Sequence, residues 1–193
     1  MEAAGDLIWE SSYGATSVDD ICEEAGVKKG SFYHFFKSKA DLQIASMEAD
    51  WEERRQLMDG LFSPSLPPLE RLERFFDFVA DRQAALQTEC GCVLGCPLFT
   101  IGSEVSTLEA GIREKVQGIL NRYRLYFETA IRDAHADGLL FAPDAKAKAR
   151  ILFAYFQGTM TQARIENNAD LLRGLKDGAF ALLGVKRAEA VFA

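Results

Sequence analysis

Length and composition exclude several classes of protein. The chain has 193 residues, of which 48% are hydrophobic and 26% are charged, so it can bury a core and is not intrinsically disordered. No run reaches the roughly 18 uncharged apolar residues of a membrane helix, and the opening residues lack the basic start and apolar stretch of a signal peptide. We therefore expect a cytoplasmic protein with no membrane contact. The net charge of −7 argues against a nucleic-acid partner, but its distribution along the chain matters more than its sum.

Helical patterns follow one another along the chain without a convincing strand pair. In the N-terminal part, helices are predicted over residues 2–12, 16–25, 28–34 and 39–61. Thr16 followed by Asp19 indicates a capping box at the start of the second helix, and Gly26 is placed to end that helix. Ser38 is the expected N-cap of the long helix over 39–61.

A proline-rich linker at residues 63–68 separates this part from the rest, because three prolines in five residues cannot lie inside a helix. Beyond it, helices are predicted from residue 69, over about 98–107, over about 112–138, around 151–163 and around 171–183. The chain is therefore predicted to be all-α, with about nine helices.

Residues 16–39 have the layout of a helix-turn-helix, in which two short helices pivot on Gly26 and the second enters the major groove of DNA. From Gly26 to Ala40 the chain carries four lysines and no acidic residue. The Lys, Ser, Tyr and His side chains of the second helix offer hydrogen-bond donors to phosphates and base edges. This segment is therefore predicted to bind DNA.

The same segment closely resembles the TetR family of bacterial transcription regulators over residues 13–43. The matching residues are Thr16, Ile21, Ala25, Gly26, Val27, Gly30, Phe32, Tyr33, Phe36 and Lys39. The resemblance implies that eight side chains face the operator: Thr16, Ser17, Lys28, Lys29, Ser31, Tyr33, His34 and Lys39. The chain departs from the family pattern at Cys22, where an Ala is usual, and at Lys28, where a Ser or Thr usually caps the recognition helix. Family members also usually carry a basic arm before the residues that match Leu7, and either a late start of the given sequence or a protein that does without the arm explains the difference.

The resemblance also implies the domain organisation. A three-helix DNA-binding domain is expected over residues 1–45, connected by the long helix 39–61 to a ligand-binding and dimerisation domain over 46–193. The expected function is that of a homodimeric regulator that leaves a palindromic operator when a small-molecule effector binds. The two protomers are expected to pair through the last two long helices. Repression is the usual family behaviour, and activation stays open.

Aromatic residues of the C-terminal part are candidates for an effector pocket. They are Phe75, Phe76, Phe99, Tyr123, Tyr126, Phe127 and Phe156, together with Met160. The alternative interpretation is that these side chains form the hydrophobic core. As a group they favour a small, mostly apolar effector.

A cluster of three cysteines, Cys90, Cys92 and Cys96, lies in a glycine-containing break between two helices. It resembles a stretch of a TetR subgroup that includes electrophile-sensing members, so a repressor switched through these thiols is the alternative function. Two other interpretations stay open, small packing residues and a metal site. The spacing lacks the Cys-x2-Cys pairs and the fourth ligand of structural zinc sites, so we expect neither a metal nor another cofactor.

An enzyme is not expected. The only histidines are His34, within the DNA-binding segment, and His135, so a cysteine nucleophile has no evident catalytic partner. No phosphate-binding glycine loop or His-Glu-x-x-His motif occurs. A helical adaptor for protein partners would keep the fold but would not need Lys28, Tyr33 and Lys39.

Overall fold

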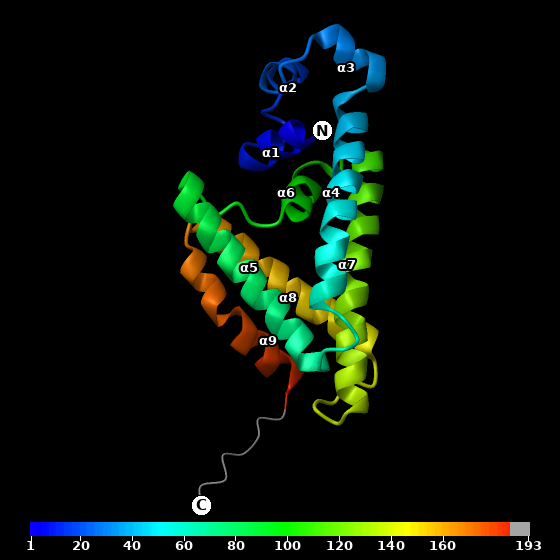
Figure 1. Ribbon diagram of the computed structural model, residues 1–193, viewed down its shortest axis with the longest axis vertical. Helices are drawn as coiled ribbons and strands as arrows, with labels where there is room; N and C mark the ends of the chain where they lie inside the picture. Colours follow the sequence, from blue (N-terminus) through cyan, green and yellow to red (C-terminus); the bar gives the residue numbers. More distant parts are fainter. Residues whose placement is uncertain (186–193) are drawn as a thin grey trace, which may run out of the picture. The chain divides into compact units, whose positions relative to one another are not determined.

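The computed structural model describes residues 1–185, and this part contains nine α-helices, one 3-10 helix and no strand (Figure 1). The helices are α1 (Glu2–Glu10), α2 (Val18–Glu24), α3 (Lys29–Phe35), α4 (Lys39–Leu61), α5 (Pro68–Cys90), α6 (Pro97–Val105), α7 (Ala110–Ala136), α8 (Ala145–Ile165), the 3-10 helix η1 (Ala169–Gly174) and α9 (Leu175–Leu183). The all-helical architecture predicted from the sequence is confirmed. Residues 186–193 of the predicted C-terminal domain lie outside the described part.

The first of two compact units consists of Met1–Met58 and Leu94–Arg122. It contains α1, α2, α3, most of α4, α6 and the first half of α7. Apolar side chains from these helices form its core: Ala4, Ile8, Ile21, Phe32, Leu42, Met47, Trp51, Leu98, Ile101, Ile112 and Val116. The indole N–H of Trp9 donates a hydrogen bond to the carbonyl of Leu94 at 3.0 Å, which ties α1 to the segment that leads into α6.

A capping box starts α2, one residue later than predicted. The Ser17 hydroxyl accepts the Asp20 N–H at 3.1 Å, and the Asp20 carboxylate accepts the Ser17 N–H at 2.7 Å. These hydrogen bonds hold the pKa of Asp20 below its ordinary value. The prediction of Thr16 and Asp19 as the capping pair is therefore wrong. Thr16 is buried and donates its hydroxyl to the carbonyl of Ser12, so it belongs to the preceding turn.

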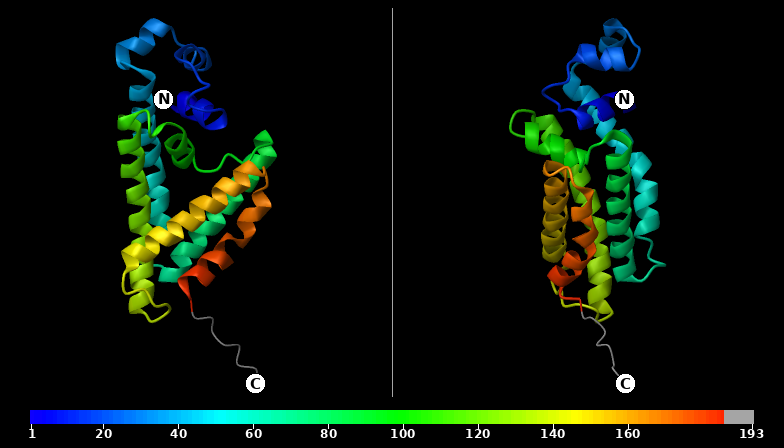
Figure 2. Two further views of the ribbon diagram at one scale, coloured as in Figure 1. Left: turned by 180° about the vertical axis from the view of Figure 1, so that it is seen from behind. Right: turned by 90° about the vertical axis from the view of Figure 1, so that its left-hand side faces the viewer.

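The second unit consists of Asp59–Val93 and Tyr123–Ala193. Within it α5, α8 and the η1–α9 segment lie side by side (Figure 2). Its core is rich in phenyl rings, which come from the α4–α5 connection, α5, α7 and α8: Phe62, Phe75, Phe76, Phe127, Phe153 and Phe156. Neighbouring rings mostly meet edge-on or tilted, as aromatic side chains prefer.

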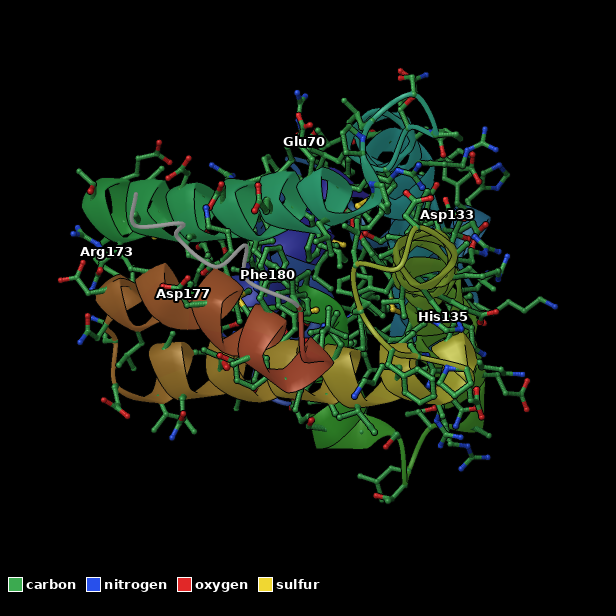
Figure 3. All side chains as sticks on the ribbon, turned by 90° about the horizontal axis from the view of Figure 1, so that it is seen from below. Glu70, Asp133, His135, Arg173, Asp177 and Phe180 are labelled. Atoms are coloured by element: carbon green, nitrogen blue, oxygen red, sulfur yellow. The ribbon has the colours of Figure 1, made fainter. Side chains whose placement is uncertain are left out.

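A buried arginine fixes the proline-rich linker in this unit. Arg71, 4% exposed, donates to the carbonyls of Leu66 at 2.9 Å and Pro64 at 3.2 Å and to the carboxylate of Asp133 on α7. Asp133 is labelled near the end of α7 in Figure 3. The guanidinium therefore connects the linker, α5 and α7 through three hydrogen bonds.

The helix predicted around residues 171–183 is two segments in the structure. The side chain of Asn168 accepts the Asp170 N–H and starts the 3-10 helix η1, and Gly174 stands at the junction with α9. Glycine weakens a helix interior because it loses more backbone freedom than other residues on folding. A single regular helix is therefore not maintained across this junction.

Candidate nucleic-acid interface

The helix-turn-helix is built around a left-handed turn between α2 and α3. Gly26 has a φ of +64°, a conformation that glycine adopts without strain. The next residue closes the turn with a 2.9 Å hydrogen bond from the Val27 N–H to the carbonyl of Cys22. Ile21 and Cys22 of α2 and Phe32 of α3 are buried, so the remaining face of α3 points away from the core (Figure 1).

Six of the eight predicted DNA-contact residues are exposed. They are Ser17, Lys28, Lys29, Ser31, Tyr33 and His34. Within residues 1–185, hydrogen bonds or ion pairs engage the side chains of two of these six. The Ser17 hydroxyl takes part in the capping box, and the ammonium of Lys29 lies 2.8 Å from the Asp19 carboxylate, which raises the pKa of Lys29. The other four are Ser31, Tyr33 and His34 on α3 and Lys28 just before it, and all of them are exposed.

The other two predicted contact residues are turned inward. Thr16 is buried, and its hydroxyl also lies 2.9 Å from that of Ser11. Lys39 donates to the carbonyls of Tyr13 at 2.6 Å and Thr16 at 2.8 Å, and its ammonium stands 4.0 Å from the centre of the Tyr13 ring. Burial lowers the pKa of Lys39, against the opposing effect of two glutamates. Lys39 therefore holds the turn between α1 and α2. The DNA contacts of Thr16 and Lys39 stay predictions.

The same turn is held from a second helix. The carboxylate of Glu104 on α6 accepts the N–H groups of Tyr13 at 3.0 Å and Gly14 at 2.6 Å. The turn thus has a carboxylate on its N–H groups and an ammonium on its carbonyls. We call Glu104, Lys39 and residues 13–16 the turn brace. The sequence pattern did not predict the turn brace, because Glu104 and Tyr13 are 91 positions apart.

Two exposed residues near the end of α3 are absent from the predicted set. Phe35, the last residue of α3, is 75% exposed, and Lys37 is exposed in the turn before α4. The spacing alone did not single out Phe35, because it lies on the same side of α3 as both the polar Ser31 and the buried Phe32.

The predicted pocket residues divide between the two units. Phe75, Phe76, Phe127 and Phe156 come together in the second unit with ring centroids 5.1 to 6.3 Å apart. These rings contact one another directly and are buried, as core residues are. Met160 is also buried on α8.

The remaining three pocket candidates are only half-buried, although the ring of Tyr126 lies 5.3 Å from that of Phe62, which packs on Phe75 and Phe127. Tyr123 and Tyr126 are half-buried on α7, and the Tyr126 hydroxyl donates to the carboxylate of Asp59. Phe99 is on α6 in the first unit. The effector pocket stays a prediction.

The cysteines differ in accessibility. All four are free thiols; Cys90 and Cys92 are exposed, Cys96 is half-buried and Cys22 is buried. The thiol of Cys90 donates to the carbonyl of Leu86 at 3.0 Å. Among the described residues, no three His, Cys, Asp or Glu side chains are grouped as metal ligands would be.

The turn that carries Cys92 is fastened to the end of α8 through Asn167. Asn167 donates its amide to the carbonyl of Gly91 at 2.9 Å and accepts the Val93 N–H at 2.8 Å. The side-chain amide of Gln87 adds two hydrogen bonds. It donates to the carbonyl of Asn167 and accepts the Ala169 N–H at 3.2 Å. Asn167 adopts a φ of +46°, unusual for a residue other than glycine. We call this arrangement the Asn167 joint.

Within residues 1–185 no helix combines the length and the hydrophobicity needed to cross a membrane.

Two family models match the chain: one described as bacterial regulatory proteins of the tetR family, over residues 1–45, and one described as a tetracyclin repressor-like C-terminal domain, over residues 68–177.

Proteins similar to this chain are transcriptional regulators. The transcriptional regulator AcuR of Cereibacter sphaeroides is 34% identical over 176 residues, which cover 89% of this chain and 78% of AcuR. The transcriptional repressor DhaR of a Mycobacterium species is 28% identical over 176 residues, covering 89% of this chain and 84% of DhaR. A crystal structure of a regulatory protein TetR from Rhodobacter sphaeroides superposes with a TM-score of 0.83 at 30% identity, covering 94% of this chain and 95% of that one.

Proposed function

Because the chain belongs to the TetR family of bacterial regulatory proteins, we propose that it is a homodimeric transcription repressor that binds a palindromic operator and leaves it when a small-molecule effector binds. The relatives are transcriptional regulators, and we propose neither an enzymatic activity nor a cofactor. We keep the division into a DNA-binding domain over residues 1–45 and a ligand-binding and dimerisation domain over 46–193, and a cytoplasmic location.

The exposed face of α3 is the observation that carries this proposal. Lys28, Ser31, Tyr33 and His34 present an ammonium, two hydroxyls and an imidazole to solvent. No acidic residue lies between Gly26 and Ala40. Such a surface suits phosphate oxygens and base edges in a major groove. Because the chain as a whole is acidic, binding away from the operator is disfavoured.

DNA binding is tested with a labelled fragment of the intergenic DNA beside the gene of this protein, at two salt concentrations. We expect tight binding that weakens as salt rises, since phosphate contacts release counterions. Lys28→Ala and Tyr33→Ala should each weaken binding, whereas Lys146→Ala on α8, in the second unit, should not. Equal binding by all these variants would move the DNA contact away from Lys28 and Tyr33, and absence of binding by every protein would leave a helical adaptor as the better interpretation.

A stripe of apolar and small residues on α8 supports the proposed dimer. Ile151, Ala154, Gly158 and Ile165 are exposed at helical spacing, with Ile151 at 52% and Ile165 at 77%. A Cβ atom at Gly158 would meet nothing within 4 Å, so the helix surface there is open to close approach by a second helix. Gly158→Arg should give a monomer in sedimentation experiments. Gly118→Arg, at another open glycine, should stay dimeric.

The effector we propose is small and mostly apolar, because the candidate pocket residues are predominantly aromatic. Effector release requires that the ligand bind the DNA-free state more tightly than the DNA-bound state. Screening small aromatic and aliphatic compounds for loss of the protein–DNA complex tests this part. A hit should also raise the melting temperature of the free protein.

Exposure of Cys90 and Cys92 favours a second candidate, a repressor switched by thiol modification at Cys90, Cys92 and Cys96. Treatment with N-ethylmaleimide should then release DNA from the wild-type protein. A variant with these three cysteines changed to serine should keep its DNA after treatment. Release from that variant would rule out the thiols as the switch.

A further inference from the structure

Phe35 is an apolar side chain placed on the surface that we propose to meet DNA. It ends α3, and 75% of its surface is exposed, whereas Phe32 one turn earlier is 5% exposed. Its ring lies edge-on to that of His34, with centroids 4.9 Å apart. A phenyl ring left in water at this position adds little to the core of the first unit and is available to a partner.

The neighbours of Phe35 indicate what kind of partner it has. Ser31 precedes it by four positions and therefore lies on the same side of α3, and Lys28 stands just before the helix. His34 and the exposed Lys37 flank the ring along the chain. The ring is thus an apolar spot among hydrogen-bond donors and cations, which matches a polyanion that also offers an apolar group.

DNA offers such a group in its major groove. The C5-methyl of thymine is the apolar feature of the groove edge, and it lies among base acceptors and within reach of the phosphates. We propose that Phe35 contacts a thymine methyl in each half of the operator and so selects thymine at that position. This inference rests on the proposed function, since it requires that α3 enter the major groove.

Deoxyuridine substitution tests the contact one methyl group at a time. Each thymine of the bound operator is replaced by deoxyuridine at symmetric positions in both halves, and affinity is measured by fluorescence anisotropy. For the wild-type protein we expect one position where binding weakens about fourfold per methyl, the effect of losing one buried methyl group. Phe35→Ala should bind the thymine and deoxyuridine duplexes equally at that position. Phe35→Leu, which keeps an apolar side chain, should retain part of the difference.

A matched control uses an equally exposed phenylalanine in the second unit. Phe141 is 76% exposed in the loop before α8, so Phe141→Ala should respond to deoxyuridine as the wild type does. Equal melting temperatures of the wild type and of the Phe35→Ala, Phe35→Leu and Phe141→Ala variants would establish that their folds are intact.

The outcomes separate this inference from the function on which it rests. If the wild type binds its operator but is indifferent to deoxyuridine at every thymine, or if Phe35→Ala keeps the wild-type response, the methyl contact is overturned and DNA binding stands. If the wild type binds no DNA, both are overturned. Loss of self-association in Phe35→Ala, with unchanged DNA affinity, would assign the ring to a protein interface instead.

Discussion

Removing the carboxylate of Glu104 should loosen the turn between α1 and α2. Its two oxygens accept the N–H groups of Tyr13 and Gly14 at 3.0 and 2.6 Å. A hydrogen bond of this kind contributes about 1 kcal/mol net, so Glu104→Ala should reduce the free energy of unfolding by about 2 kcal/mol. Glu104→Gln should cost about 1 kcal/mol, because its amide retains only one acceptor oxygen.

Two measurements check this expectation. With a dependence on urea of about 2 kcal/mol per molar, the midpoint of unfolding should fall by about 1 M in Glu104→Ala. Hydrogen exchange of the Tyr13 and Gly14 amides reports on the bonds themselves, and these amides should exchange roughly 30-fold faster if the turn opens locally. DNA affinity should fall as well, because the turn leads directly into α2.

Glu114 provides the control, as an exposed glutamate at the start of α7. Glu114→Ala should leave both the urea midpoint and the two exchange rates unchanged. The reasoning fails if Glu104→Ala unfolds at the wild-type urea concentration and its Tyr13 and Gly14 amides exchange no faster than before.

Three further predictions follow from buried, charged and thiol groups. Arg71→Ala should destabilise the chain by about 3 kcal/mol in urea unfolding, since it removes three hydrogen bonds from a buried guanidinium and leaves a carboxylate without its partner. The pKa of Glu48 is lowered by hydrogen bonds from an arginine and a lysine of α7, so its contribution to stability is present at neutral pH and is lost as the pH falls through the folded-state pKa. Glu48→Gln should therefore be less stable than the wild type at pH 7, and the difference should shrink as the pH falls below the ordinary pKa of glutamate and vanish below the folded-state pKa. Of the four thiols, Cys90 and Cys92 should react rapidly with Ellman's reagent in the native protein, and Cys22 only on unfolding.

Each of these three has its own control. Arg82→Ala, at a half-exposed arginine with a loose 3.9 Å ion pair, should change stability by less than about 0.5 kcal/mol. Glu52→Gln, at a more exposed pair, should reduce the stability at pH 7 less than Glu48→Gln does. Rapid labelling of a variant that retains only Cys22 would contradict the burial of that thiol.

Most helix boundaries were predictable because they depend on local chemistry. Pro67 and Pro68 can only begin a helix, and glycines at positions 26 and 184 adopt the left-handed conformation that ends one. The cap of α2 was not decided locally, because Thr16–Asp19 and Ser17–Asp20 have the same spacing and the same chemistry. Burial of Thr16 in the preceding turn selects the second pair.

The candidate interface was predictable in its position but not in every side chain. Lys39 lies at a position where the helix N-terminus favours a phosphate contact, yet its ammonium binds two carbonyls of the α1–α2 turn. That choice depends on α1, which comes from another part of the chain. Phe35 and Phe36 are adjacent and chemically identical, so only the direction of α3 against its neighbours decides that the first is exposed and the second half-buried.

The Asn167 joint should restrict which residues evolution or mutagenesis accepts at an exposed position. Asparagine tolerates a positive φ and carries both a donor and an acceptor. Glycine would adopt the positive φ but would supply neither side-chain hydrogen bond. Aspartate would lack the donor to the carbonyl of Gly91. In a saturation mutagenesis experiment, position 167 should therefore show the intolerance of a core residue, although its side chain lies at the surface.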